Sequence, residues 1–116
     1  MTGGSTVKLI IAIVQDEDSS RLLSTLMQHG IGVTKLATTG GFLKAGNTTL
    51  LIGVDESRLQ ETVDVIEKVC KSRKQLTTAN AAPTGMTGGT YAPFPVEVTV
   101  GGATLFVLSV DQFLKV

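Results

Sequence analysis

The chain has 116 residues, of which 42% are hydrophobic and 17% charged, and its ten basic residues balance its ten acidic ones. This composition excludes a disordered chain, and the net charge of zero argues against a general nucleic-acid binder. The length fits one domain, whose core must be aliphatic because aromatic residues make up only 4%.

The first half of the chain predicts a strand, a helix and a second strand. Residues 1–6 are small and polar and are expected to form a flexible lead to a domain spanning 7–116. VKLIIAIVQ (7–15) is nearly continuous in apolar, β-branched residues, which indicates a central strand buried on both faces. Three acidic residues then favour the start of a helix, which should run to about residue 29, and Gly30 should end it.

The second half predicts two further strands around a second helix, and then a hairpin. The loop that begins at residue 74 contains all three prolines and is expected to be long. The pair Gly101-Gly102 lies between two alternating runs, which is a hairpin signal. The predicted ranges are strands at 31–39 and 48–54, a helix from 55 or 57 to about 72, a loop at 74–95, and strands at 96–100 and 103–110.

The order strand, helix, strand, strand, helix, strand predicts an α+β, ferredoxin-like (βαββαβ) fold with an antiparallel sheet and both helices on one face. Both faces of the first strand are apolar, since Ile10, Ala12 and Val14 alternate with other apolar residues. The simplest cover for the second face is another copy of the chain.

The stretch TKLATTGGFLKAGNTT (34–49) concentrates groups that can contact a ligand. Its glycines let backbone N–H groups approach closely, its Thr and Asn side chains can hydrogen-bond, and its Phe and Lys offer a stacking face and a positive charge. A plain hairpin is the alternative. No acidic residue occurs between Asp18 and Asp55 or between Glu67 and Glu97, which suggests an anion site unless chance produced these tracts.

Other functional signals are weak. With a single cysteine, Cys70, and a single histidine, we expect no internal disulfide, no transition-metal site within one subunit and a cytoplasmic setting. No constellation of nucleophile, acid and base is visible, so an enzyme is not expected. No signal peptide is apparent, and the apolar run 9–14 is too short to span a membrane.

Three motifs together resemble the PII-like cyclic di-AMP receptor proteins: VKLIIAIVQDEDS, TKLATTGGFLKAGNTTLLIGV and YAPFPVEVTVGGATLFVL. The resemblance covers nearly everything after residue 6. It implies a homotrimer that binds cyclic di-AMP at three subunit interfaces, with a short T-loop at 40–47 and a long B-loop at 74–95. It also implies a signalling protein rather than an enzyme, without a cofactor or membrane insertion, acting on an unidentified downstream protein.

The resemblance also assigns roles to residues of the expected site. Phe42 would stack on an adenine and Asn47 would bind an adenine edge, while Thr34 and backbone amides near Gly41 would hold a phosphate. Phe106 would either close the pocket or pack in the core. The full set of expected ligand contacts is Thr34, Gly41, Phe42, Leu43, Lys44, Asn47, Gly53, Phe106 and Lys115.

Four positions depart from the family pattern. Gly32 stands where the family places an arginine, and Gly30 where it commonly has an asparagine. Lys44 replaces an arginine, and Lys115 falls at the position of a glutamine. A glycine cannot grip a phosphate through a bidentate fork. Two alternatives therefore stay open: a PII-like sensor of a mononucleotide such as ATP or AMP, and an interaction trimer without a small ligand.

Overall fold

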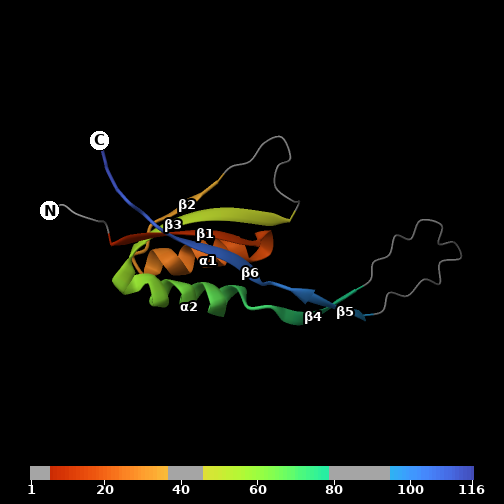
Figure 1. Cartoon of the computed structure of the whole chain (residues 1–116). Coiled ribbons are helices and arrows are strands. Elements are labelled where there is room, and N and C mark those ends of the chain that lie inside the picture. Colours follow the sequence, from red (N-terminus) through yellow and green to blue (C-terminus); the bar gives the residue numbers. More distant parts are fainter. Residues whose placement is uncertain (1–5, 37–45, 79–94) are drawn as a thin grey trace, which may run out of the picture.

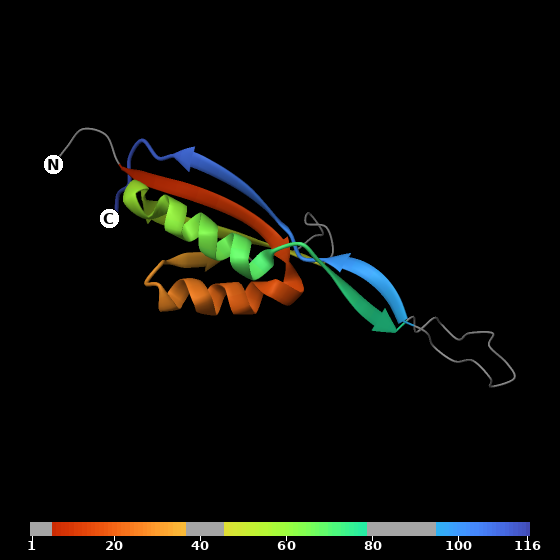
Figure 2. The same cartoon turned by 90° about the horizontal axis from the view of Figure 1, so that it is seen from below.

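The computed structural model describes residues 6–36, 46–78 and 95–116. Two helices lie together on one face of a sheet, and a two-stranded ribbon projects away from this body (Figures 1 and 2). The elements are β1 (Val7–Gln15), α1 (Asp16–Gln28), β2 (Val33–Lys35), β3 (Asn47–Asp55), the 3-10 turn η1 (Glu56–Arg58), α2 (Leu59–Cys70), β4 (Arg73–Thr78), β5 (Pro95–Val100) and β6 (Ala103–Ser109).

The main sheet has the strand order β2-β3-β1-β6, and each neighbouring pair is antiparallel. β1 lies inside the sheet, as its two-sided apolar sequence predicts. The sheet and its two helices confirm the predicted α+β arrangement with an antiparallel sheet. The first helix and the third strand match their predicted ranges to within about two residues, while β2 is shorter than the predicted strand.

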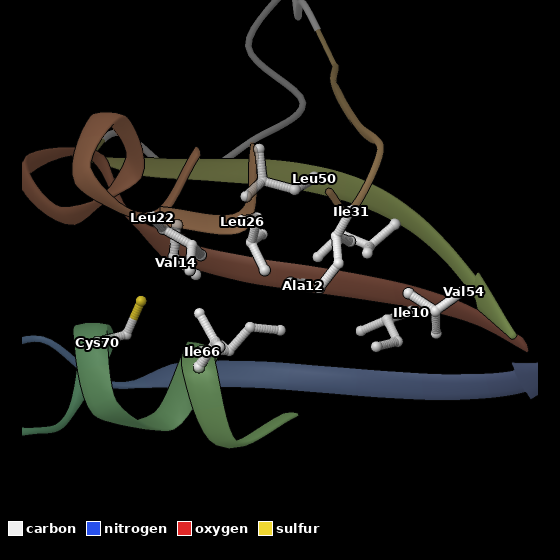
Figure 3. Packing of buried hydrophobic residues seen from close by; sticks show 12 residues of the cluster. Ile10, Ala12, Val14, Leu22, Leu26, Ile31, Leu50, Val54, Ile66 and Cys70 are labelled. Atoms are coloured by element: carbon white, nitrogen blue, oxygen red, sulfur yellow. The ribbon is translucent and has the colours of Figure 1, made fainter. Parts of the chain in front are cut away.

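The core lies between the sheet and the helices. Every second residue of β1, namely Ile10, Ala12 and Val14, is buried against it. Leu26 of α1 and Ile66 of α2 point into the same space (Figure 3). Burial of each large aliphatic side chain contributes about 1.5–3 kcal/mol. This aliphatic core explains the burial of only one face of the sheet, the face that the helices cover.

Local signals set the ends of the helices. Gly30 adopts φ +74°, and the Ile31 amide donates to the Leu26 carbonyl, so α1 ends at the glycine as predicted. The Asp55 carboxylate accepts a hydrogen bond from the Ser57 amide at 2.8 Å and caps η1. Hydrogen bonds from the Thr6 hydroxyl and from Ser57 lower the pKa of Asp55 to about 2.

The expected hairpin at Gly101-Gly102 is wrong. β5 pairs with β4, while β6 pairs with β1 in the main sheet. Both glycines have positive φ (+86° and +94°), so the chain bends there from the ribbon into the sheet instead of folding back on itself. The first residues of the segment expected as a loop, 74–78, belong to β4, because they find a partner in the alternating strand β5. Residues 79–94 lie outside the described residues.

Candidate ligand-binding site

The face of the sheet away from the helices is uncovered in the described part of the chain. We call it the open face, and it carries the side chains that alternate with the buried ones along β1 and β3. Because directly paired residues share a face, the register assigns its members. The largest apolar ones are Leu9, Ile11, Ile13, Leu51, Phe106 and Leu108. Phe106 is 53% exposed, which is unusual for a phenylalanine on a sheet.

Four of the predicted ligand contacts share this open face. Thr34 pairs with Leu51, and Leu51 pairs in turn with Ile11, the partner of Phe106. Gly53 is opposite Leu9, and Asn47 is opposite Gln15, so both lie on the same side of the sheet. The residue pattern did not show this convergence, since Phe106 was equally compatible with the core. The pairing register resolves that alternative: Phe106 is on the open face.

The four residues do not form one compact pocket within a single copy. Thr34 is on the edge strand β2 and Phe106 on the opposite edge strand β6. Three strand spacings separate them, or roughly 14 Å. A ligand moiety in contact with the β2 edge is therefore beyond direct reach of Phe106 of the same copy.

The remaining predicted contacts are not placed at this face by the described structure. Gly41, Phe42, Leu43 and Lys44 lie outside the described residues. Lys115 is in the exposed tail that follows β6. Hydrogen bonds hold the described residues on either side of 37–45. The Leu36 amide donates to the Thr49 carbonyl at 3.0 Å, and the Asp16 amide donates to the Gly46 carbonyl at 2.8 Å.

Two polar residues of the open face escaped the sequence interpretation. Thr49 is 7% exposed, and among the buried side chains that the structure describes its hydroxyl has no hydrogen-bond partner. An unpaired buried hydroxyl costs about 1–3 kcal/mol, so it is a group that a ligand or second copy can satisfy. Gln15 borders Asn47, and its side-chain oxygen accepts a hydrogen bond from the Gly101 amide at 2.7 Å. Period-two alternation along their strands would have found both.

The two glycines that depart from the family pattern differ in their backbone. Gly30 has positive φ, a conformation that side chains other than Asn rarely adopt. Gly32 has an ordinary φ, and a Cβ built on it meets no atom within 4 Å. A side chain at position 32, two residues before Thr34, therefore has room.

The chemistry of the described residues gives little support to catalysis. Burial raises the pKa of the Cys70 thiol to about 11, which disfavours the reactive thiolate. Within the ranges that the structure describes, no cluster of three or more His, Cys, Asp or Glu side chains could hold a metal ion. Two clefts of ≈ 380 and ≈ 430 Å³ lie along the helices, and none of the expected ligand contacts that the structure describes lines them.

The antiparallel sheet in the order β2-β3-β1-β6, with both helices on one face, defines a ferredoxin-like α+β protein, and a PII protein is among the solved structures of similar fold. Arabidopsis thaliana PII, in a crystal structure with bound citrate, is 20% identical and matches with a TM-score of 0.60 over 97% of this chain and 82% of that one. A DUF3240 family protein from Shewanella baltica is 12% identical, with a TM-score of 0.56 over 97% and 98% of the two chains. These likenesses concern the fold.

The sequence model of the cyclic-di-AMP receptor family matches residues 7–116, and the chain belongs to this family. A protein of unknown function from Pediococcus pentosaceus is 40% identical, with a TM-score of 0.73 over 96% of this chain and 98% of that one. Among the described residues, no helix is long and apolar enough to cross a membrane.

Proposed function

We propose that the protein is a homotrimeric sensor that binds cyclic di-AMP between its copies. The open face forms the contact between copies, and the bound nucleotide changes the segments at 40–47 and 79–94. A downstream protein reads that change. In this scheme the protein carries out no reaction and needs no cofactor.

One observation carries the proposal: Thr34, Asn47, Gly53 and Phe106 share an apolar face that no described element covers. Apolar surface of this kind on a soluble body marks a contact site. Thr34 and Phe106 lie on opposite edge strands of the sheet, and this separation supports a site that a second copy completes. The family to which the chain belongs supplies the ligand.

Each group suits part of the nucleotide. The exposed ring of Phe106 can stack on an adenine, which contributes about 1–3 kcal/mol per base. The Asn47 amide matches the donor and acceptor on an adenine edge. The pairing of β3 with β2 covers only Leu50 to Ile52, so the β2 side of Gly53 has no strand partner, and the absence of a side chain gives a base access to its backbone.

Calorimetric titration with cyclic di-AMP, ATP and cyclic di-GMP tests the ligand, and light scattering tests the trimer. Cyclic di-AMP should bind most tightly, at one molecule per subunit. Phe106→Ala should weaken binding at least about tenfold, since one stacking contact is lost. Phe113→Ala removes a phenyl ring of similar exposure, 61% against 53% for Phe106, from the tail and serves as the control. Absence of heat with every cyclic dinucleotide would refute the ligand assignment.

Gly32 favours a second candidate, a PII-like sensor of a mononucleotide such as ATP or AMP. The missing arginine fork reduces the charge available to a ligand with two phosphates. Tighter binding of ATP or AMP than of cyclic di-AMP in the same titration would select this candidate.

A further inference from the structure

The junction between β1 and α1, residues 15–18, contacts two other parts of the chain: the start of β3 and the base of the ribbon formed by β4 and β5. On one side it holds the end of the 40–47 segment and the first residues of β3. The Asp16 amide donates to the Gly46 carbonyl at 2.8 Å, and the Thr48 hydroxyl donates to the Asp16 carboxylate. Gln15 pairs with Asn47, the expected adenine contact. Three successive residues, 46–48, are thus attached to two residues of the junction.

On its other side the same junction holds the base of the ribbon. Arg73, the first residue of β4, donates through Nη2 to Asp18 Oδ1 at 2.9 Å and through Nη1 to Asp18 Oδ2 at 3.4 Å. The Gly101 amide, just after β5, donates to the Gln15 side chain at 2.7 Å. Both strands of the ribbon are therefore attached to the junction, and the start of α1 lies beside the ribbon base (Figure 2).

The Asp18 contact is the firmest of these attachments. The Asp18 side chain is 1% exposed, so its carboxylate relies on partners within the protein rather than on water. Arg21 is a weaker partner, at 3.5 Å and with a 61% exposed side chain. A buried carboxylate that loses its main cation is left undercompensated, which makes displacement of Arg73 costly. The charge-assisted bonds to Asp18 raise the pKa of Arg73, so the guanidinium stays charged.

We propose that Gln15, Asp16 and Asp18 are positioning residues that couple the base of the ribbon to Asn47 in the candidate site. They touch no ligand themselves. Asp16 and Gln15 act through the backbone at residues 46–48, and Asp18 acts through Arg73 on the ribbon. Movement of the ribbon shifts the first turn of α1, and the turn transmits the shift to Asn47. This inference rests on the proposed function for its ligand, whereas the mechanical link does not depend on any ligand.

The link is tested without ligand by amide hydrogen exchange measured residue by residue. Arg73→Gln removes the charge that holds Asp18, and Asp64→Asn on the outer surface of α2 is the control. In Arg73→Gln, exchange of the Asp16 amide should rise at least about tenfold, while the core amide of Ile52 should not change. Arg73→Lys should restore part of the protection because it keeps the charge. An unchanged Asp16 amide in Arg73→Gln would overturn the coupling.

Titration with cyclic di-AMP then separates this inference from the proposed function. If the wild type binds, Arg73→Gln should weaken binding about fivefold or more with an unchanged trimer. Equal affinities of the wild type and Arg73→Gln would overturn the positioning role. A wild type that binds no cyclic dinucleotide refutes the proposed function, and the exchange measurement alone then decides the link. Asp18→Asn, which leaves no uncompensated buried charge, is the second variant if Arg73→Gln does not fold, and it should weaken binding in the same way.

Discussion

The two faces of the main sheet are both apolar, yet only one of them is covered by the chain's own helices. On β3 the contrast falls between neighbours: Leu50 is fully buried on the helix side, and Leu51 is partly exposed on the open face. β1 alternates in the same way. Hydrophobicity alone therefore does not tell which of the two faces the chain's own helices cover. Polar residues do not separate the faces either, because Asn47 and Thr49 lie on the open face while Thr48 lies on the helix side.

The largest expected effect is on the covered face. Leu50→Ala should lower the free energy of unfolding by about 2–5 kcal/mol, because it leaves a cavity in a closed core. Chemical denaturation measures the change. The loss should be the same at every protein concentration. A loss that depends on concentration would mean that the helix-side core is itself shaped by assembly, which would break the distinction between the faces.

The next effect is expected on the open face. Ile11→Lys adds a charge at its centre, next to Phe106 and Leu51, without touching the helix-side core. Light scattering should show loss of the trimer, while circular dichroism should retain the helix and strand signal. Lys8→Ile at the rim of the same strand is a control for altered charge. An intact trimer in Ile11→Lys would show that the open face is not the contact between copies.

A gain of binding is predicted at the edge of the open face. Gly32→Arg should be tolerated, since the position is open, and should tighten binding of an anionic ligand by about tenfold. Titration with cyclic di-AMP measures the gain. Gly30→Arg is the contrasting variant: it adds the same charge at a backbone with positive φ and should cost stability. No gain with Gly32→Arg would place the phosphates elsewhere.

The smallest effect concerns acid stability on the helix side, far from the open face. The Arg58 hydrogen bond, and then that of His29, lowers the pKa of Glu61 from 4.5 to about 2. A depressed folded-state pKa stabilises the protein above pH 4.5, and this contribution is lost as the pH falls towards 2. Glu61→Gln should therefore be less stable than the wild type at neutral pH, with a difference that shrinks in acid. A urea titration at several pH values measures it. A constant difference would contradict the assignment.

The fold was largely predictable because its signals are local. The apolar run of β1, the acidic start of α1 and the positive φ of Gly30 all act within a few residues. The failure at Gly101-Gly102 has a physical cause: two glycines mark a sharp bend, but only a distant partner decides whether the strands beside it pair. Here β5 pairs with β4, and β6 pairs with β1.

The candidate site was less predictable than the fold, since it depends on register. Thr34, Asn47 and Gly53 were identified from a resemblance, and only strand pairing puts them on one face with Phe106. In the sequence Thr49 is one of several threonines, and only the structure shows that its hydroxyl is buried without a hydrogen-bond partner. The contacts of Asp18 with Arg73 join residues 55 positions apart, which no local pattern could indicate.

The position of β1 inside the sheet also has a consequence for how the chain folds. β1 is the first strand in the sequence, yet its partner β6 is the last, and Lys8 of β1 bonds to Ser109 across a separation of 101 residues. Closing such a long loop is slow compared with forming a helix or local hairpin. During biosynthesis, the edge of β1 that pairs with β6 therefore stays without its native partner until almost the whole chain has been made. In that time it can pair with a wrong strand. We therefore expect the pairing of β6 with β1 to be a late step in folding.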